Sequence, residues 1–258
     1  MNAARTIGFA LALLAIAHSA SAHDFEFYGR VEQFTWEEFV EGERILEEDG
    51  LRYNLGTRAT IEDFHYWRLG LRAEGMLGSV DYEGHTVGGN PQSSNTDYFG
   101  IQCDLFASLL PRDPTGLNAH PIIGVGGRYW IRRISKGSAS DGGYDEAWLA
   151  VYGQLGVELQ WAATPNTRLF ARMLNRPALY NNTQYSLELE DEKNFSLKPG
   201  RTTTWELEAG IAYRDIQLSV LYETLAFGRS SSHTVPPHEV FQPESEGSIL
   251  GLQLALLW

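Results

Sequence analysis

The sequence contains a single cysteine, Cys103, among 258 residues. One thiol cannot form an internal disulfide framework, so a secreted chain of this kind must be stabilised by its secondary structure. Basic residues are also few, because 20 Lys and Arg stand against 33 Asp and Glu and give a formal net charge of −13. This balance argues against nucleic acid as a partner.

Beyond the first two dozen residues the chain lacks any long uncharged apolar run, so no helical membrane span is expected. The first segment carries Arg5, an apolar run from Ile7 to Ala17 and small residues up to Ala22. This pattern predicts a secretory signal peptide over residues 1–22, cleaved before His23. Cleavage leaves 258 − 22 = 236 residues with a net charge of −14, enough for one closed all-β domain over residues 23–258.

Runs of alternating apolar and polar residues fill the rest of the chain. Each is about a dozen residues long, which suits a tilted strand that crosses a membrane. Ten runs begin near Phe25, Leu51, Trp67, Phe99, Pro121, Leu149, Arg168, Trp205, Ile216 and Gly247. The run from Arg168 to Tyr180 is the weakest, because arginines and apolar residues share a face and Pro177 must lie near a strand end or at a bulge. If that run and a neighbour are loop, the count falls to eight.

The last run, from Gly247 to Trp258, has one continuously apolar face that ends on an aromatic residue. It resembles the C-terminal strand by which bacterial outer-membrane β-barrels are recognised for insertion. The resemblance implies a partner, the barrel-assembly machinery, and an insertion signal made of Leu252, Leu254, Leu256 and Trp258. The alternative is the last strand of a soluble secreted β protein, which needs polar outward faces.

The connections alternate in length along the chain. Long segments follow the first, third, fifth, seventh and ninth runs, whereas short turns follow the second, sixth and eighth, and the segment after the fourth is compact. A barrel inserted from the periplasm has short periplasmic turns and longer outer loops. The sequence therefore predicts a transmembrane antiparallel up-and-down β-barrel of about ten strands in a Gram-negative outer membrane, closed by pairing of its first and last strands.

Aromatic residues fall near the expected strand ends, where membrane barrels carry girdles of rings. We expect the periplasmic girdle to contain Trp67, Trp161, Tyr213 and Trp258, and the outer girdle to contain Tyr82, Tyr98, Trp148 and Tyr180.

The inward faces of the runs are strongly charged and nearly balanced. The expected inward basic residues are Arg30, Arg52, Arg58, Arg68, Arg72, Arg128, Arg132, Arg168, Arg172, Arg176 and Arg214. The expected inward acidic residues are Glu26, Glu32, Glu62, Glu74, Asp104, Glu158, Glu206, Glu208 and Glu223. Such an interior is similar to that of small outer-membrane barrels of the OmpA transmembrane-domain type, which implies a lumen filled by ion pairs and a structural or interaction role. Those barrels have eight strands, so the wider lumen of ten leaves a porin-like path for small solutes open as an alternative.

The excess negative charge is assigned to the outer loops. Residues 36–50, WEEFVEGERILEEDG, contain seven carboxylates and apolar residues at roughly helical spacing, which suggests a short amphipathic helix over the mouth. These carboxylates face lipopolysaccharide, the expected partner besides the lipid bilayer. No regular calcium loop is present, so no metal site and no cofactor are assigned, and a monomer is expected.

An enzyme is the less favoured possibility, as an outer-membrane protease or a lipid-modifying enzyme. Ten-stranded omptin proteases use acidic residues with an Asp/His pair at the outer mouth, and Asp81, Glu83 and His85 lie at the top of the third run. The pair Asp63 and His65 falls at the wrong end, and Ser232 beside His233 lies in a loop. We therefore assign no catalytic residue.

Overall fold

The computed structural model describes residues 25–64, 66–85, 91–110, 116–137, 143–187, 193–235 and 238–258. The expected signal peptide, residues 1–22, lies outside these ranges. None of the described residues forms a helix long and apolar enough to cross a membrane.

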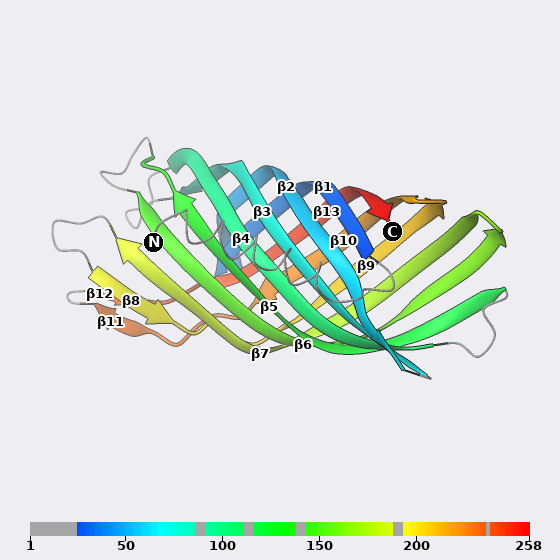
Figure 1. The fold of residues 1–258 in the computed structure, drawn as a ribbon. Coiled ribbons are helices and arrows are strands. Elements are labelled where there is room, and N and C mark those ends of the chain that lie inside the picture. The colour runs from blue at the N-terminus through cyan, green and yellow to red at the C-terminus, as the bar shows by residue number, and fades with distance from the viewer. Residues whose placement is uncertain are drawn as a thin grey trace.

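Ten long antiparallel strands form a closed barrel, which confirms the predicted fold class and strand number. The ring contains β1 (Phe25–Val40), β2 (Glu43–Asp63), β3 (Trp67–His85), β4 (Pro91–Leu109), β5 (Leu117–Ile134), β6 (Tyr144–Thr164), β7 (Thr167–Leu187), β9 (Thr203–Tyr213), β10 (Ile216–Phe227) and β13 (Glu244–Leu257). Three short strands lie in the connections, namely β8 (Lys193–Leu197), β11 (His233–Val235) and β12 (His238–Val240). Figure 1 shows the tilted strands running side by side around the barrel.

The first and last strands close the ring. The backbone N–H of Phe25 donates to the carbonyl of Trp258 at 3.0 Å, and the N–H of Trp258 donates to the carbonyl of Phe25 at 2.9 Å. In Figure 1 the start of β1 and the C-terminus lie close together at one end of the barrel. We call this the turn end, because it also carries the short connections after β2, β6 and β9, and we call the opposite end the loop end.

Alternation of side chains produces an apolar belt on the outside of the barrel. The exposed apolar positions of β13 are Leu250, Leu252, Leu254 and Leu256, and Trp258 directly after the strand is also exposed, as the pattern predicts. Toward the loop end the outward residues of the same strands become polar, for example Glu246 on β13 and the exposed ion pair of Arg133 with Asp145. The strands are therefore longer than the belt, and the barrel extends beyond it at the loop end.

The expected amphipathic helix in residues 36–50 is wrong. This segment continues β1 and β2 as a hairpin that turns at Glu41 and Gly42, with φ values of 54° and 82°. Two consecutive positive φ values define the type I′ turn, whose twist matches that of paired strands. Strand alternation outweighs the helical spacing because Trp36 and Glu38 bury their side chains inside the barrel.

Three of the eight aromatic assignments are also wrong. Trp67, Trp161, Tyr213 and Trp258 are exposed on the outside at the turn end, and Tyr180 is exposed as expected. Tyr82, Tyr98 and Trp148 instead face the interior, with Trp148 only 1% exposed. They occupy inward positions on strands that continue past the belt, so they contribute to a core and not to a girdle. Pro177 lies next to a register shift between β6 and β7, in agreement with the expected bulge.

Candidate functional site: the barrel interior

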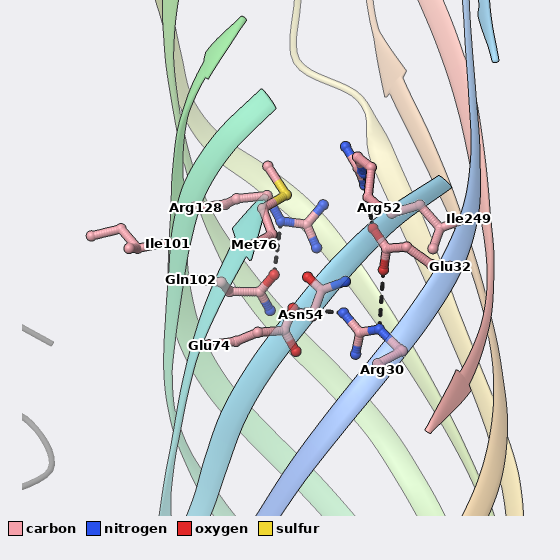
Figure 2. A pocket seen from close by; sticks show the side chains of 10 residues that line it. All are labelled: Arg30, Glu32, Arg52, Asn54, Glu74, Met76, Ile101, Gln102, Arg128 and Ile249. Atoms are coloured by element: carbon pink, nitrogen blue, oxygen red, sulfur yellow. Dashed lines mark hydrogen bonds and ion pairs between the residues drawn. The ribbon is translucent and has the colours of Figure 1, made fainter. Parts of the chain in front are cut away.

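The middle of the barrel is filled by arginines and carboxylates in contact. Arg30 donates through Nε to Glu32 at 3.0 Å and through a terminal nitrogen to Glu74 at 2.6 Å. Arg52 reaches Glu32 at 2.6 Å. Figure 2 shows these side chains pointing toward one another from neighbouring strands, around a gap of only about 10 Å³. That volume is about the size needed for one water molecule.

The same layer continues across the barrel. Arg72 contacts Asp104 at 3.0 Å and Glu206 at 3.2 Å. Arg176 contacts Glu206 at 2.8 Å and Glu223 at 3.1 Å. Each of these two guanidinium groups therefore contacts two carboxylates, and the two carboxylates come from different strands.

Two further arginines complete this layer. Arg128 contacts Glu223 at 2.8 Å, and Arg172 pairs with Glu208. The layer then holds six arginines and six carboxylates, so its charge is balanced. The basic members are Arg30, Arg52, Arg72, Arg128, Arg172 and Arg176, and the acidic members are Glu32, Glu74, Asp104, Glu206, Glu208 and Glu223.

Toward the loop end a second charged group centres on Arg132. Its guanidinium contacts Glu38 at 2.8 Å, Glu48 at 2.9 Å and Glu146 at 3.0 Å. Three carboxylates around one arginine leave an excess of negative charge. Burial, together with the nearby Glu38 carboxylate, raises the pKa of Glu146 to about 7. This group lies beyond the apolar belt, since its neighbour Asp145 forms an exposed ion pair with Arg133 on the outside.

An aromatic layer surrounds the Arg132 group. Trp148 stacks on Trp130 with ring centroids 5.3 Å apart, and it meets Trp36 at 5.5 Å and Phe227 at 5.1 Å. The indole N–H groups of Trp36 and Trp148 donate to Glu38 and Glu146 at 3.0 and 2.9 Å. This layer was not predicted. The alternation of inward and outward residues would direct Trp36, Trp130 and Trp148 inward. It does so only if their strands extend this far, which the sequence does not reveal.

A hollow of about 210 Å³ lies at the turn end. Its charged lining consists of Glu26, Arg58, Arg68, Glu158, Arg168 and Arg172. Arg58 contacts Glu26 at 3.2 Å, and Arg172 contacts Glu158 at 3.5 Å. Among the described side chains, ion pairs and aromatic rings fill the middle and outer parts of the interior, and a hollow lies at the turn end.

One of the residues expected inside the barrel is placed differently. Arg214 lies in the exposed turn between β9 and β10 with a φ of 52°, and its guanidinium lies 5.4 Å from the Tyr213 ring centroid. Strand alternation ends at Tyr213, so it no longer directs the Arg214 side chain inward. Arg168 lines the turn-end hollow, as its inward position predicts, and is exposed there. The side chain of Glu62 lies outside the described part of the structure.

The candidate catalytic residues do not converge. Asp81, Glu83 and His85 are exposed at alternate positions of β3, on the outer face of the barrel and not at its mouth. Ser232 and His233 are exposed in the connection after β10. His65 and the side chain of Asp63 lie outside the described residues. Within the described ranges no group of three or more His, Cys, Asp or Glu residues is arranged to hold a metal ion.

Comparison with known proteins gives a match in fold alone. No protein-family model and no curated protein matches the chain. Among solved structures, the outer-membrane protease OmpT of Escherichia coli matches with a TM-score of 0.56 and 10% identity, over 93% of this chain and 98% of that chain. The transport unit of the autotransporter AIDA-I from Escherichia coli gives a TM-score of 0.47 and 9% identity, over 92% of this chain and 91% of that chain, which is too low to support an argument. The chain thus has the fold of an outer-membrane β-barrel.

Proposed function

We propose that the protein is an integral outer-membrane barrel with a closed interior, and that it has a structural or interaction role at the cell surface. The observation that carries the proposal is the filling of the barrel. A balanced layer of six arginines and six carboxylates is followed by the aromatic layer around Arg132. A solute entering from the turn end meets both.

The apolar belt supports a position in a lipid bilayer. Exposed leucines on β13 are continued by Leu218 and Val220 on β10 and by Leu55 on β2. Such a surface on a closed barrel satisfies the rule that a spanning sheet must leave no unpaired edge. A secretory signal over residues 1–22 is consistent with export, and the turn end then faces the periplasm.

The partners follow from this orientation. We propose that the outward apolar strand ending in Leu252, Leu254, Leu256 and Trp258 is the segment that the barrel-assembly machinery recognises. The exposed carboxylates beyond the belt face the lipopolysaccharide side, where Glu37 and Glu47 already share Arg44. The carboxylates and the phosphate groups of lipopolysaccharide repel one another, so we propose that divalent cations bridge them.

A porin-like channel is the second candidate, and the turn-end hollow favours it. The hollow is wide enough for a small solute, but the cavity among the ion-paired side chains is only about 10 Å³. Conduction would require the buried ion pairs to separate, and an uncompensated buried charge costs several kcal/mol. We therefore rank a channel below a closed barrel.

Catalysis of the omptin type is the least favoured. It needs acidic and histidine side chains that face one another across the mouth, whereas Asp81, Glu83 and His85 point outward from one strand. We propose that the barrel is not an enzyme.

Liposome swelling tests the proposal. Vesicles containing the refolded protein and an impermeant osmolyte are diluted into an isotonic solution of arabinose, with an open porin as the positive control. A closed barrel gives no swelling above that of empty vesicles. Swelling at the rate of the porin would replace the closed barrel by the channel.

A further inference from the structure

The described side chains that line the turn-end hollow are mainly basic, in contrast to the chain as a whole. Four arginines and two glutamates line it, an excess of two positive charges among its described side chains, in a chain of net charge −13. At the loop end the relation is reversed, since three glutamates surround Arg132. Among the described side chains, basic groups therefore outnumber acidic ones around the hollow, and Arg68 has an interaction partner of its own.

The two glutamates of the lining already have partners. Glu26 accepts from Arg58 at 3.2 Å, while Glu158 accepts from the Gln160 side chain and lies 3.5 Å from Arg172. These pairs leave Arg168 without an ion pair to any described residue. Its exposed guanidinium keeps its donors available to a bound acceptor.

Neutral donors and an apolar wall complete the lining. Ser108 and Gln217 supply a hydroxyl and an amide, and Phe106 and Phe170 supply ring surface. Guanidinium groups match the oxygen geometry of phosphate and carboxylate, often in pairs of parallel hydrogen bonds. A volume of about 210 Å³ exceeds that of a single ordered water many times, at roughly 10–15 Å³ each.

We propose that this hollow binds a small organic oxyanion, a phosphate monoester or a carboxylate, with its charged group at Arg58 and Arg168 and its apolar part against Phe106 and Phe170. The site opens at the turn end, away from the acidic surface, and the binding does not depend on whether the barrel conducts. A soluble periplasmic anion and the phosphate of an anionic phospholipid share this chemistry.

Isothermal titration of the full-length refolded barrel in dodecyl maltoside micelles tests the site, because this detergent carries no phosphate. The probes are phenyl phosphate and benzoate, with benzyl alcohol as the uncharged analogue, all at one ionic strength set with sodium chloride. We expect saturable binding of both anions and none of benzyl alcohol. Absence of saturable binding by both anions overturns the proposal.

Two variants locate the binding. Arg168→Gln removes a lining guanidinium, and Arg214→Gln removes the same charge from an exposed turn at the same end of the barrel. Loss of one charged hydrogen-bond donor weakens binding about tenfold or more. We expect that loss for Arg168→Gln alone. The heat-dependent gel shift of barrels should show that both variants are folded. Equal affinities of the two variants contradict the site.

A competition step identifies the source of the ligand. Short-chain phosphatidylglycerol added to the micelles displaces phenyl phosphate if the lipid headgroup reaches the hollow. Unchanged phenyl phosphate affinity assigns the site to soluble anions. Both results presuppose that phenyl phosphate binds in the hollow. The competition step therefore distinguishes the two sources of ligand and cannot replace a titration that shows no binding.

Discussion

At the scale of single residues, the interior is organised by arginines that each serve more than one carboxylate. Arg72, Arg132 and Arg176 do so with side chains from strands that are distant in the sequence. Their inward direction was predictable, because alternation within a strand is a local property. Their pairing was not, since it depends on which strands face each other across the barrel. Arg214 fails the prediction because it belongs to a turn, where alternation has no meaning.

Glu146 is expected to make stability depend on pH. Burial raises its pKa to about 7, whereas a free glutamate has a pKa of about 4.3. Between these values the folded state holds a proton that the unfolded state has lost, so stability falls as the pH rises from about 4.3 to about 7. Glu146→Gln removes this contribution, and the urea midpoint should then fall less between pH 5 and pH 8 than in the unchanged protein. Glu246→Gln, at an exposed site on β13, is the control. An identical pH dependence in the Glu146 variant and the unchanged protein would be evidence against the shifted glutamate.

At the scale of elements, hairpins proved longer than their sequence signals. The tight turns at the turn end were predictable from short polar segments between two runs. The hairpin of residues 36–50 was not predictable, because two patterns fit this segment. A helical spacing fits Trp36, Phe39, Val40, Ile45 and Leu46, and strand alternation fits Trp36 and Glu38. Only the barrel partners on β2 and β13 decide between the two.

Close packing between neighbouring strands gives a prediction for β2. A Cβ atom at Gly56 would lie 2.4 Å from the ring of Tyr28, whose hydroxyl donates to Glu74 at 2.8 Å. The ring cannot retreat without losing that bond, so Gly56→Ala should destabilise the barrel by about 1–3 kcal/mol. Gly29→Ala on β1 is the matched control, because no atom lies within 4 Å of its added Cβ. Urea unfolding of both variants measures the difference, and equal midpoints would contradict the packing described.

At the scale of the whole molecule, the barrel and its apolar belt were predictable, but the level at which the belt ends was not. The position of the lipid boundary is set by the outward faces of all ten strands together. Tyr82, Tyr98 and Trp148 were therefore assigned to an outer girdle although they form part of the core beyond it.

The depth of the belt can be tested on a single strand. Leu254 lies in the middle of the exposed apolar row of β13, and Glu246 lies beyond its outer end on the same strand. Leu254→Arg should cost about 2–4 kcal/mol of folding free energy in phospholipid vesicles, and Glu246→Arg should cost about 0–1 kcal/mol. Reversible refolding from denaturant into vesicles measures both. Similar costs for the two substitutions would mean that the belt does not mark the bilayer.

We propose that side chains of the described strands close the interior. Single-channel recording of the refolded protein in a planar bilayer tests it most directly, after a heat-dependent gel shift has shown that the barrel is folded. We predict no steady conductance, because ion pairs fill the middle of the barrel and the cavity beside Arg30, Glu32 and Arg52 is only about 10 Å³. A stable, reproducible conductance in the folded protein would contradict the account and favour a channel.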